Sequence, residues 1–187
     1  MTGVILAGGN SKRMGTNKAF LKINGQRMID QTVDLFKNIF DEIILVTNSP
    51  QEYLYLNVRI VTDLIPGKGA LGGLYTGLFF ASSQHIFVTA CDIPFLNREF
   101  IDYMISKVDN FDVLVPHSIG GLEPLHAIYS KTCIRHIEAL LELNDLKITN
   151  FYPKVRLKEI GFKETLSFDP KQSLFFNLNV PEDLGKV

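Results

Sequence analysis

Short, nearly continuous apolar runs alternate along this chain with longer segments in which apolar residues recur at helical spacing. We predict strands at residues 3–7, 43–47, 58–62, 85–90, 112–116 and 125–129, and near 155–160 and 175–178. We predict helices at 27–40, 70–82, 97–108, with Asn97 as a cap, and 131–143, and a last helix from Pro181. Strands without polar alternation are typical of a parallel sheet covered by helices on both faces. The sequence therefore predicts an α/β fold with a mostly parallel central sheet.

The composition limits the partners that the chain can bind. Its 187 residues fit a single domain, 1–187, and 46% hydrophobic residues can form a substantial core. The 19 basic and 20 acidic residues give a net charge of −1, whereas broad binding to nucleic acid or to a membrane surface usually needs a basic excess. We expect neither partner. An anionic ligand has to be met by the local basic cluster at residues 12–18.

Several features predict a cytoplasmic protein. Met1 lies only two residues before the first predicted strand, so we expect no signal or transit peptide, and the apolar runs are far shorter than a membrane span. Cys91 and Cys133 are too far apart in sequence to indicate a zinc motif or a disulfide framework. We expect Cys91 to be a small buried apolar residue in a reducing compartment.

The first predicted strand leads directly into a glycine-rich, basic loop. Residues 6–18 read Leu-Ala-Gly-Gly-Asn-Ser-Lys-Arg-Met-Gly-Thr-Asn-Lys. Backbone N–H groups together with Lys12, Arg13 and Lys18 suit the phosphates of a nucleotide. The spacing matches neither a P-loop nor the dinucleotide motif G-x-G-x-x-G, and several cations favour a triphosphate. The alternative is a solvated basic surface loop.

Polar and glycine-rich segments follow the predicted strands. Asn48 follows the second strand, Asp63 the third and Asp92 the fourth. Later segments of the same kind contain Gly120, Gly121, Asn177 and Asn179. Ligands of open α/β sheets bind outside the carboxyl ends of the strands, so the pattern predicts one site at that edge.

Asp92 is the strongest single candidate for chemistry. A nucleoside triphosphate normally arrives with Mg²⁺, which prefers one or two carboxylates together with phosphate oxygens and water. Asp63 can accept the N1–H and 2-amino hydrogens of guanine, or bind a ribose diol. Both aspartates also suit turns, so a purely structural role stays open for each. No pair of histidines has metal-ligand spacing, and we expect His126 to be a packed, hydrogen-bonded side chain.

Four motifs follow one another along almost the whole chain. They are L-A-G-G-x-S-x-R-M-G-x-x-K-A at 6–19, D-L-I-P-G-x-G-A-L-G-G at 63–73, C-D-I-P-F at 91–95 and F-N-L-N-V-P-E-D-L at 176–184. Together they resemble the motifs of the molybdenum cofactor guanylyltransferases, within the wider nucleotidyltransferase group. The resemblance implies a Rossmann-like three-layer sandwich of the nucleotide-diphospho-sugar transferase type.

The resemblance also implies a reaction and a set of roles. The family transfers GMP from GTP to molybdopterin that carries molybdenum, with Mg²⁺, and releases pyrophosphate. Other cofactor-biosynthesis proteins and apo-molybdoenzymes are further partners that it suggests. The nucleotide would be held by Leu6, Ala7, Gly8, Gly9, Lys18, Asn48, Asp63 and Asp92. The phosphates would meet Arg13 and Lys18, the metal would bind Asp92, and the pterin would lie near Asn177 and Asn179.

Two departures from the family pattern concern the second motif. Ala70 stands where proline is frequent in the family, and Gly72 stands where alanine is frequent. Both positions keep small residues, but the sequence does not fix the conformation of this turn. The alternatives are another nucleotidyltransferase, such as a molybdopterin cytidylyltransferase or a sugar- or alditol-phosphate enzyme, and a non-enzymatic nucleotide-binding domain. Relatives of the first kind tend to have alanine where this chain has Gly8, which favours the larger purine here.

Overall fold

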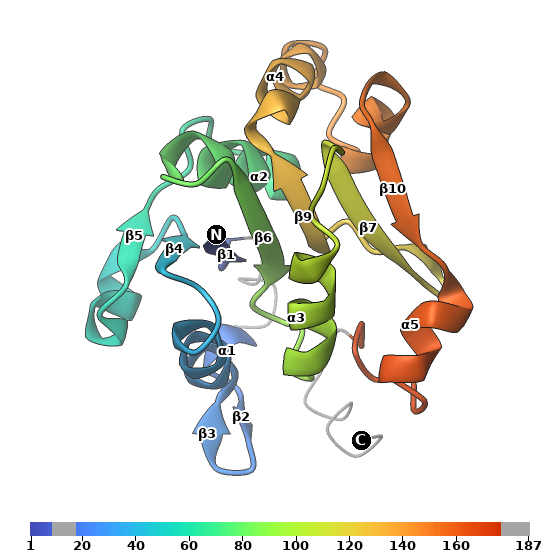
Figure 1. Ribbon diagram of the computed structural model, residues 1–187. Coiled ribbons are helices and arrows are strands. Elements are labelled where there is room, and N and C mark those ends of the chain that lie inside the picture. The colour runs from blue at the N-terminus through green and yellow to red at the C-terminus, as the bar shows by residue number, and fades with distance from the viewer. Residues whose placement is uncertain (9–17, 177–187) are drawn as a thin grey trace.

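The computed structural model describes residues 1–8 and 18–176, and an eight-stranded sheet lies at its centre. The strand order is β10-β7-β9-β6-β1-β4-β5, and β8 pairs with β7 (Figure 1). The bounds are β1 Thr2–Leu6, β4 Glu42–Val46, β5 Arg59–Val61, β6 His85–Ala90, β7 Val113–Ser118, β8 Gly121–Leu122, β9 His126–Ser130 and β10 Leu157–Ile160. A separate hairpin is formed by β2 (Lys22–Ile23) and β3 (Gln26–Arg27).

The sheet is mostly parallel, as predicted. β1 runs parallel to β4 and β6, β5 runs parallel to β4, and β10 runs parallel to β7. β9 is antiparallel to both of its neighbours, β6 and β7, and it begins with His126 opposite Thr89. The carboxyl ends of β1, β4, β5, β6 and β7 therefore meet at one edge, and β9 starts from that same edge.

Helices cover both faces of the sheet and make three layers (Figure 1). One face packs against α2 (Gly69–Phe80) and α4 (Ile134–Glu142), and the other packs against α1 (Met28–Lys37) and α3 (Arg98–Ser106). Along β1, Val4 and Leu6 pack in the hydrophobic core on the α2–α4 face, and Ile5 packs in the core on the α1–α3 face, as the two-residue period of a strand requires. The remaining elements are α5 Phe162–Phe168, η2 Lys18–Phe20, η3 Pro50–Leu56, η4 Lys131–Cys133 and η5 Ile148–Lys154.

Glycines allow α2 to lie close against β1. A Cβ atom built on Gly77 would stand 2.7 Å from Cγ1 of Val4, and one built on Gly73 would stand 3.2 Å from Cδ2 of Leu6. Distances under about 3 Å force a neighbour to shift, so a larger residue at Gly77 would push the helix away from the strand. This contact fixes the start of α2 behind the end of β1, at the edge where the predicted site lies.

Most predicted elements are present within one to three residues of their expected ends. Asn97 caps α3 as predicted, because its side-chain oxygen accepts a hydrogen bond from the N–H of Phe100 at 3.1 Å. The strand predicted near 175–178 is wrong at residues 175 and 176, which lie in a turn and irregular chain, and its remainder and the helix from Pro181 fall outside the described residues. Among residues 1–8 and 18–176, every helix is too short or too polar to cross a lipid bilayer.

Candidate active site

The predicted site residues that the structure describes lie at the carboxyl edge of neighbouring strands. Backbone hydrogen bonds extend the ladder beyond the strand ends: the N–H of Ala7 donates to the carbonyl of Val46 at 2.8 Å, and that of Cys91 donates to Leu6 at 3.0 Å. Leu6 is buried, Ala7 is half-buried and Gly8 is exposed. Among the described residues, nothing would lie within 4 Å of a Cβ atom built on Gly8, so none of them blocks a ligand from approaching the backbone there.

Asn48 and Asp63, from two adjacent strand ends, bind each other. The Asn48 amide donates to Oδ2 of Asp63 at 2.7 Å, and the Asp63 backbone N–H donates to the Asn48 oxygen at 3.3 Å. The next residue, Leu64, donates its N–H to the hydroxyl of the buried Thr76 on α2 at 3.1 Å. The pair is therefore tied to the helix, and its carboxylate is held in one orientation.

The turn that leads from Asp63 into α2 depends on glycine. Gly67 and Gly69 have φ values of +79° and +56°, in the left-handed region that favours glycine. A Cβ atom on Gly72 would stand 2.8 Å from the Cβ of Lys68, so an alanine at this position would require the turn to shift. Glycine in place of the family's frequent alanine at position 72 is therefore required by the conformation of this turn.

Asp92 follows β6 at this edge, and the charge of Lys18 is near enough to act on its carboxylate. Burial raises the pKa of Asp92 above its ordinary value, and the nearby charge of Lys18 works in the opposite direction. Lys18 begins η2, the first described element after the glycine-rich loop. Cys91 is half-buried rather than buried as predicted, and desolvation of its thiol raises the pKa to about 12.

Asp92 suits a magnesium site that uses one protein carboxylate. Mg²⁺ keeps several waters and binds through one or two carboxylates and the phosphates of a substrate. In the described part of the chain, no group of three or more His, Cys, Asp and Glu side chains could hold a metal by itself. A cation at Asp92 would offset the burial that raises its pKa, so the residue fits a metal shared with the nucleotide.

Five residues predicted for the site lie outside the described residues: Gly9, Lys12, Arg13, Asn177 and Asn179.

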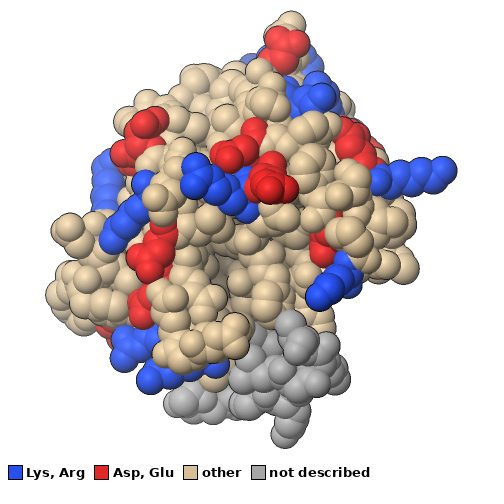
Figure 2. Space-filling model, turned by 60° about the horizontal axis from the view of Figure 1, so that its bottom comes forward, with Lys and Arg blue, Asp and Glu red and all other residues tan. Residues whose placement is uncertain are grey.

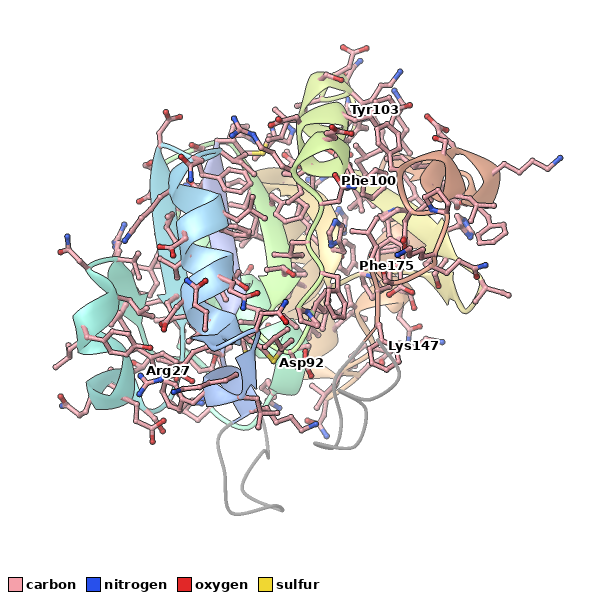
Figure 3. The ribbon with its side chains drawn as sticks, turned by 90° about the horizontal axis from the view of Figure 1, so that it is seen from below. Arg27, Asp92, Phe100, Tyr103, Lys147 and Phe175 are labelled. Atoms are coloured by element: carbon pink, nitrogen blue, oxygen red, sulfur yellow. The ribbon has the colours of Figure 1, made fainter. Side chains whose placement is uncertain are left out.

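A cavity that sequence reasoning missed lies on the other half of the same edge. It has a volume of about 290 Å³ and lies between the β7–β8 turn and α5. Glu123 lines it, as do Thr165, Phe175 and Phe176. Seen from below, Asp92 falls between Arg27 on one side and Phe175 on the other (Figure 3). The only available signal was the Gly120-Gly121 turn after a predicted strand.

The side chain of His126 is packed as predicted, but its ring has no hydrogen-bond partner among the described residues, which corrects part of the expectation. The ring is fully buried, and neither nitrogen has a hydrogen-bond partner within the described ranges. It contacts the rings of Phe87, Phe100 and Phe175 at centroid distances of 5.0, 5.7 and 5.3 Å. Burial among these rings lowers the pKa of His126 to about 3, so the ring is neutral in the folded protein.

Arg27 is a further cation near η2 that the sequence did not single out. Its guanidinium lies over the rings of Phe20, 5.2 Å from the centroid, and Tyr55, 5.4 Å away. In the view of Figure 2, basic and acidic side chains of the described residues are intermingled over the surface. The face seen in that view therefore shows no broad basic patch among the described residues.

The sheet and its helical layers define an α/β fold of the nucleotide-diphospho-sugar transferase type. The same fold occurs in molybdopterin-guanine dinucleotide biosynthesis protein A from Archaeoglobus fulgidus, with a TM-score of 0.83, 23% identity, and coverage of 100% of this chain and 96% of that one. A model of the MobA-like NTP transferase domain matches residues 3–154. The chain belongs to that family of nucleotidyltransferases.

Two curated relatives are similar over the whole chain. A protein of Desulfosudis oleivorans named molybdenum cofactor guanylyltransferase is 40% identical over 189 residues, which cover 100% of this chain and 94% of the relative. A protein of Pelotomaculum thermopropionicum with the same name, qualified there as probable, is 40% identical over 186 residues, covering 100% and 91%. The family that the four motifs indicated is therefore confirmed.

Proposed function

We infer that the protein transfers GMP from GTP to molybdopterin that carries molybdenum, releases pyrophosphate and forms the molybdopterin guanine dinucleotide cofactor. The observation that carries this conclusion is the 40% identity, over the full chain, to a molybdenum cofactor guanylyltransferase. The local geometry supports it, because β1 and β6 run side by side, Asp92 follows β6, and the charge of Lys18 acts on that carboxylate.

The nucleotide occupies the half of the edge formed by β1, β4 and β5. The backbone of Leu6, Ala7, Gly8 and Gly9 and the Asn48–Asp63 pair hold the guanosine. Asp63 has one carboxylate oxygen engaged by Asn48, and its other oxygen can accept from the guanine base. Arg13 and Lys18 meet the phosphates, and Asn177 and Asn179 lie on the pterin side.

The reaction is an in-line displacement at the α-phosphorus. A phosphate oxygen of molybdopterin forms the new bond, while the bond to the bridging oxygen breaks and pyrophosphate leaves. Lys18 stabilises the charge that develops on the phosphates, and Asp92 would hold Mg²⁺, which would supply further neutralisation of the phosphate charge. Such transfers depend on positioning and charge stabilisation more than on a protein nucleophile. Burial explains the raised pKa of Asp92, so this shift is no evidence that Asp92 acts as a general base.

Further proposals follow from the same assignment. We expect one functional domain over 1–187 in the cytoplasm, where other cofactor-biosynthesis proteins and apo-molybdoenzymes would supply the pterin and receive the product. Nucleic acid and membranes have no place in this reaction.

The test is to incubate the purified protein with molybdenum-loaded molybdopterin, Mg²⁺ and each nucleoside triphosphate separately. We expect pyrophosphate with GTP and little with CTP, ATP or UTP. Equal or faster turnover with CTP would transfer the assignment to a cytidylyltransferase. Tight GTP binding without any release of pyrophosphate would indicate instead a non-enzymatic nucleotide-binding domain.

A further inference from the structure

We propose that Arg27 is a positioning residue for Lys18, because its guanidinium holds η2, the short helix that begins with Lys18, against η3. Arg27 itself does not contact the nucleotide. The proposal rests on the proposed function, in which Lys18 meets the phosphates. It adds to that function a residue that lies outside all four sequence motifs.

The Arg27 side chain joins two short helices that lie far apart in the sequence. Its Cζ atom stands 5.2 Å from the ring centroid of Phe20, the last residue of η2, and 5.4 Å from that of Tyr55 in η3. A planar guanidinium is attracted to the faces of aromatic rings and stacks on them. One exposed side chain therefore contacts both helices at once.

A second contact joins the same two helices inside the core. The ring of Phe20 stacks on that of Tyr53, with centroids 5.1 Å apart and an interplanar angle of 28°. Tyr53 is fully buried, and so is Ala19, which precedes Phe20 in η2. Phe20 is therefore held against η3 in the core by Tyr53 and at the surface by Arg27.

Asp30 fixes the outer ring of this arrangement. Tyr55 is 51% exposed, yet its hydroxyl donates a hydrogen bond to Oδ1 of Asp30 at 2.7 Å. Asp30 lies in the first turn of α1, and Arg27 directly precedes that helix. The tyrosine ring and the guanidinium are therefore both anchored at the start of α1.

Backbone hydrogen bonds connect this arrangement to Lys18. The N–H of Leu21 donates to the carbonyl of Lys18 at 3.0 Å, and the N–H of Met28 donates to the carbonyl of Leu21 at 3.0 Å. A displacement of η2 therefore moves the backbone of Lys18, whose charge acts on the carboxylate of Asp92. Figure 3 shows Arg27 to one side of Asp92, as expected for a residue that acts through η2.

The first test compares variants of Arg27 in pyrophosphate release from GTP, with molybdenum-loaded molybdopterin and Mg²⁺. A cation over an exposed aromatic ring favours the contact by a factor of about 2–5, so losing two such contacts in Arg27→Ala should lower kcat about tenfold. The KM for GTP should stay within about twofold, because the lost effect belongs to the transition state. Arg27→Lys keeps a cation near the rings and should remain within about threefold of the wild type, whereas Arg27→Gln should resemble Arg27→Ala.

The same substitution in a Lys18→Ala background shows whether Arg27 acts through the lysine. Arg27→Ala should then lower kcat by less than about twofold further, since the group that it positions is already absent. A loss of about tenfold in both backgrounds would overturn the proposal, because a direct contact with the phosphates or a general weakening of the fold predicts it. The control is Lys107→Ala, which removes a cation 4.8 Å from the ring centroid of Tyr103 on α3 and should keep nearly full activity.

Amide hydrogen exchange tests the contact without turnover. Arg27→Ala should speed exchange of the Leu21 amide, which donates to Lys18, by about fivefold or more, and Lys107→Ala should leave it unchanged. Exchange that is as slow in Arg27→Ala as in the wild type would overturn the proposal. Faster exchange in Arg27→Ala, with no pyrophosphate released by the wild type, would refute the proposed function alone.

Discussion

The two halves of the carboxyl edge, the nucleotide half at β1, β4 and β5 and the cavity half at β9 and β7, differ in how their polar side chains are hydrogen-bonded. On the nucleotide half, Asn48 and Asp63 are partly accessible and bind each other through two hydrogen bonds. On the cavity half, His126 and Thr165 are buried and have no hydrogen-bond partner among the described residues. The polar groups of the first half are fixed by their own hydrogen bonds, whereas the second contains two buried side chains without partners in the described ranges, one of which, that of Thr165, belongs to a residue that lines the cavity.

This difference predicts opposite effects of mutation. Where polar groups already bind each other, removing one leaves its partner unpaired and alters the geometry offered to a ligand. Where a buried polar group is unpaired, an apolar replacement of the same shape relieves a destabilising group in the free protein. Variants on the nucleotide half should therefore impair ligand binding, whereas apolar replacements of unpaired groups on the cavity half should stabilise the free protein.

The largest effect is expected at Asp92, where the two halves meet. Asp92→Asn keeps the shape but removes the charge that holds Mg²⁺, so turnover should fall by a factor on the order of 10³. GTP binding without metal should change little. The measurement is pyrophosphate release over a range of Mg²⁺ concentrations, and an unaltered Mg²⁺ dependence in the variant would exclude this role for Asp92.

Lys18→Ala comes next. Removing a charge whose interaction strengthens in the transition state should lower kcat by about 10²–10³ and leave the fold intact. Lys22→Ala, which removes an exposed lysine four residues further along, is the matched control and should keep nearly full activity. A loss smaller than about threefold in Lys18→Ala would remove Lys18 from the catalytic groups.

The choice of nucleotide base tests the Asn48–Asp63 pair of the nucleotide half directly. Asp63→Ala should reduce the preference for GTP over CTP and ATP by about tenfold or more, because a site that binds the guanine N–H groups loses its acceptor. Asn48→Ala should have a smaller effect, since it removes the group that orients the carboxylate. Competition binding with the three triphosphates measures both variants. If Asp63→Ala keeps the preference of the wild type, base recognition belongs to the loop backbone or to Asn48.

Sequence reasoning predicted the edge at which the residues of the nucleotide half lie, for a physical reason. Asn48, Asp63 and Asp92 each follow a short apolar run directly, so the strand that precedes them fixes the edge at which they lie. Lys18 could be placed there because the glycine-rich loop starts from β1. The resemblance of the motifs then gave the family and the reaction.

The cavity half could not be predicted in the same way. Its walls come from β7, the turn after it, α5 and the segment around Phe175, and the apolar pattern of β9 does not reveal that this strand runs antiparallel to its neighbours. Without that direction, Glu123 cannot be placed at the same edge as Asp92. The missing hydrogen bonds of His126 depend on three-dimensional packing against Phe87 and Phe100, which no local spacing encodes.

The smallest effect concerns stability, and it is specific to the buried histidine. The folded pKa of about 3 lies below the ordinary value of 6.5, so the unfolded chain binds the proton more readily than the folded protein does. Stability is therefore unaffected above about pH 6.5 and falls as the pH drops from there towards 3. At pH 5 the loss should be about 2 kcal/mol, from roughly 1.4 kcal/mol for each pH unit below 6.5.

Urea unfolding of the wild type and His126→Phe at pH 7.5 and pH 5 measures this loss. The quantity to compare is the change between the two pH values within each variant, because any packing strain from phenylalanine is present at both. Carboxylates with lowered pKa, such as Glu42 at about 2, lose their contribution only below about pH 4.5, so they do not interfere. His136, whose pKa is lowered less strongly by partial burial and by Arg135, provides the matched control as His136→Gln. An acid loss that survives in His126→Phe but disappears in His136→Gln would show that the buried ring is not the sensitive group.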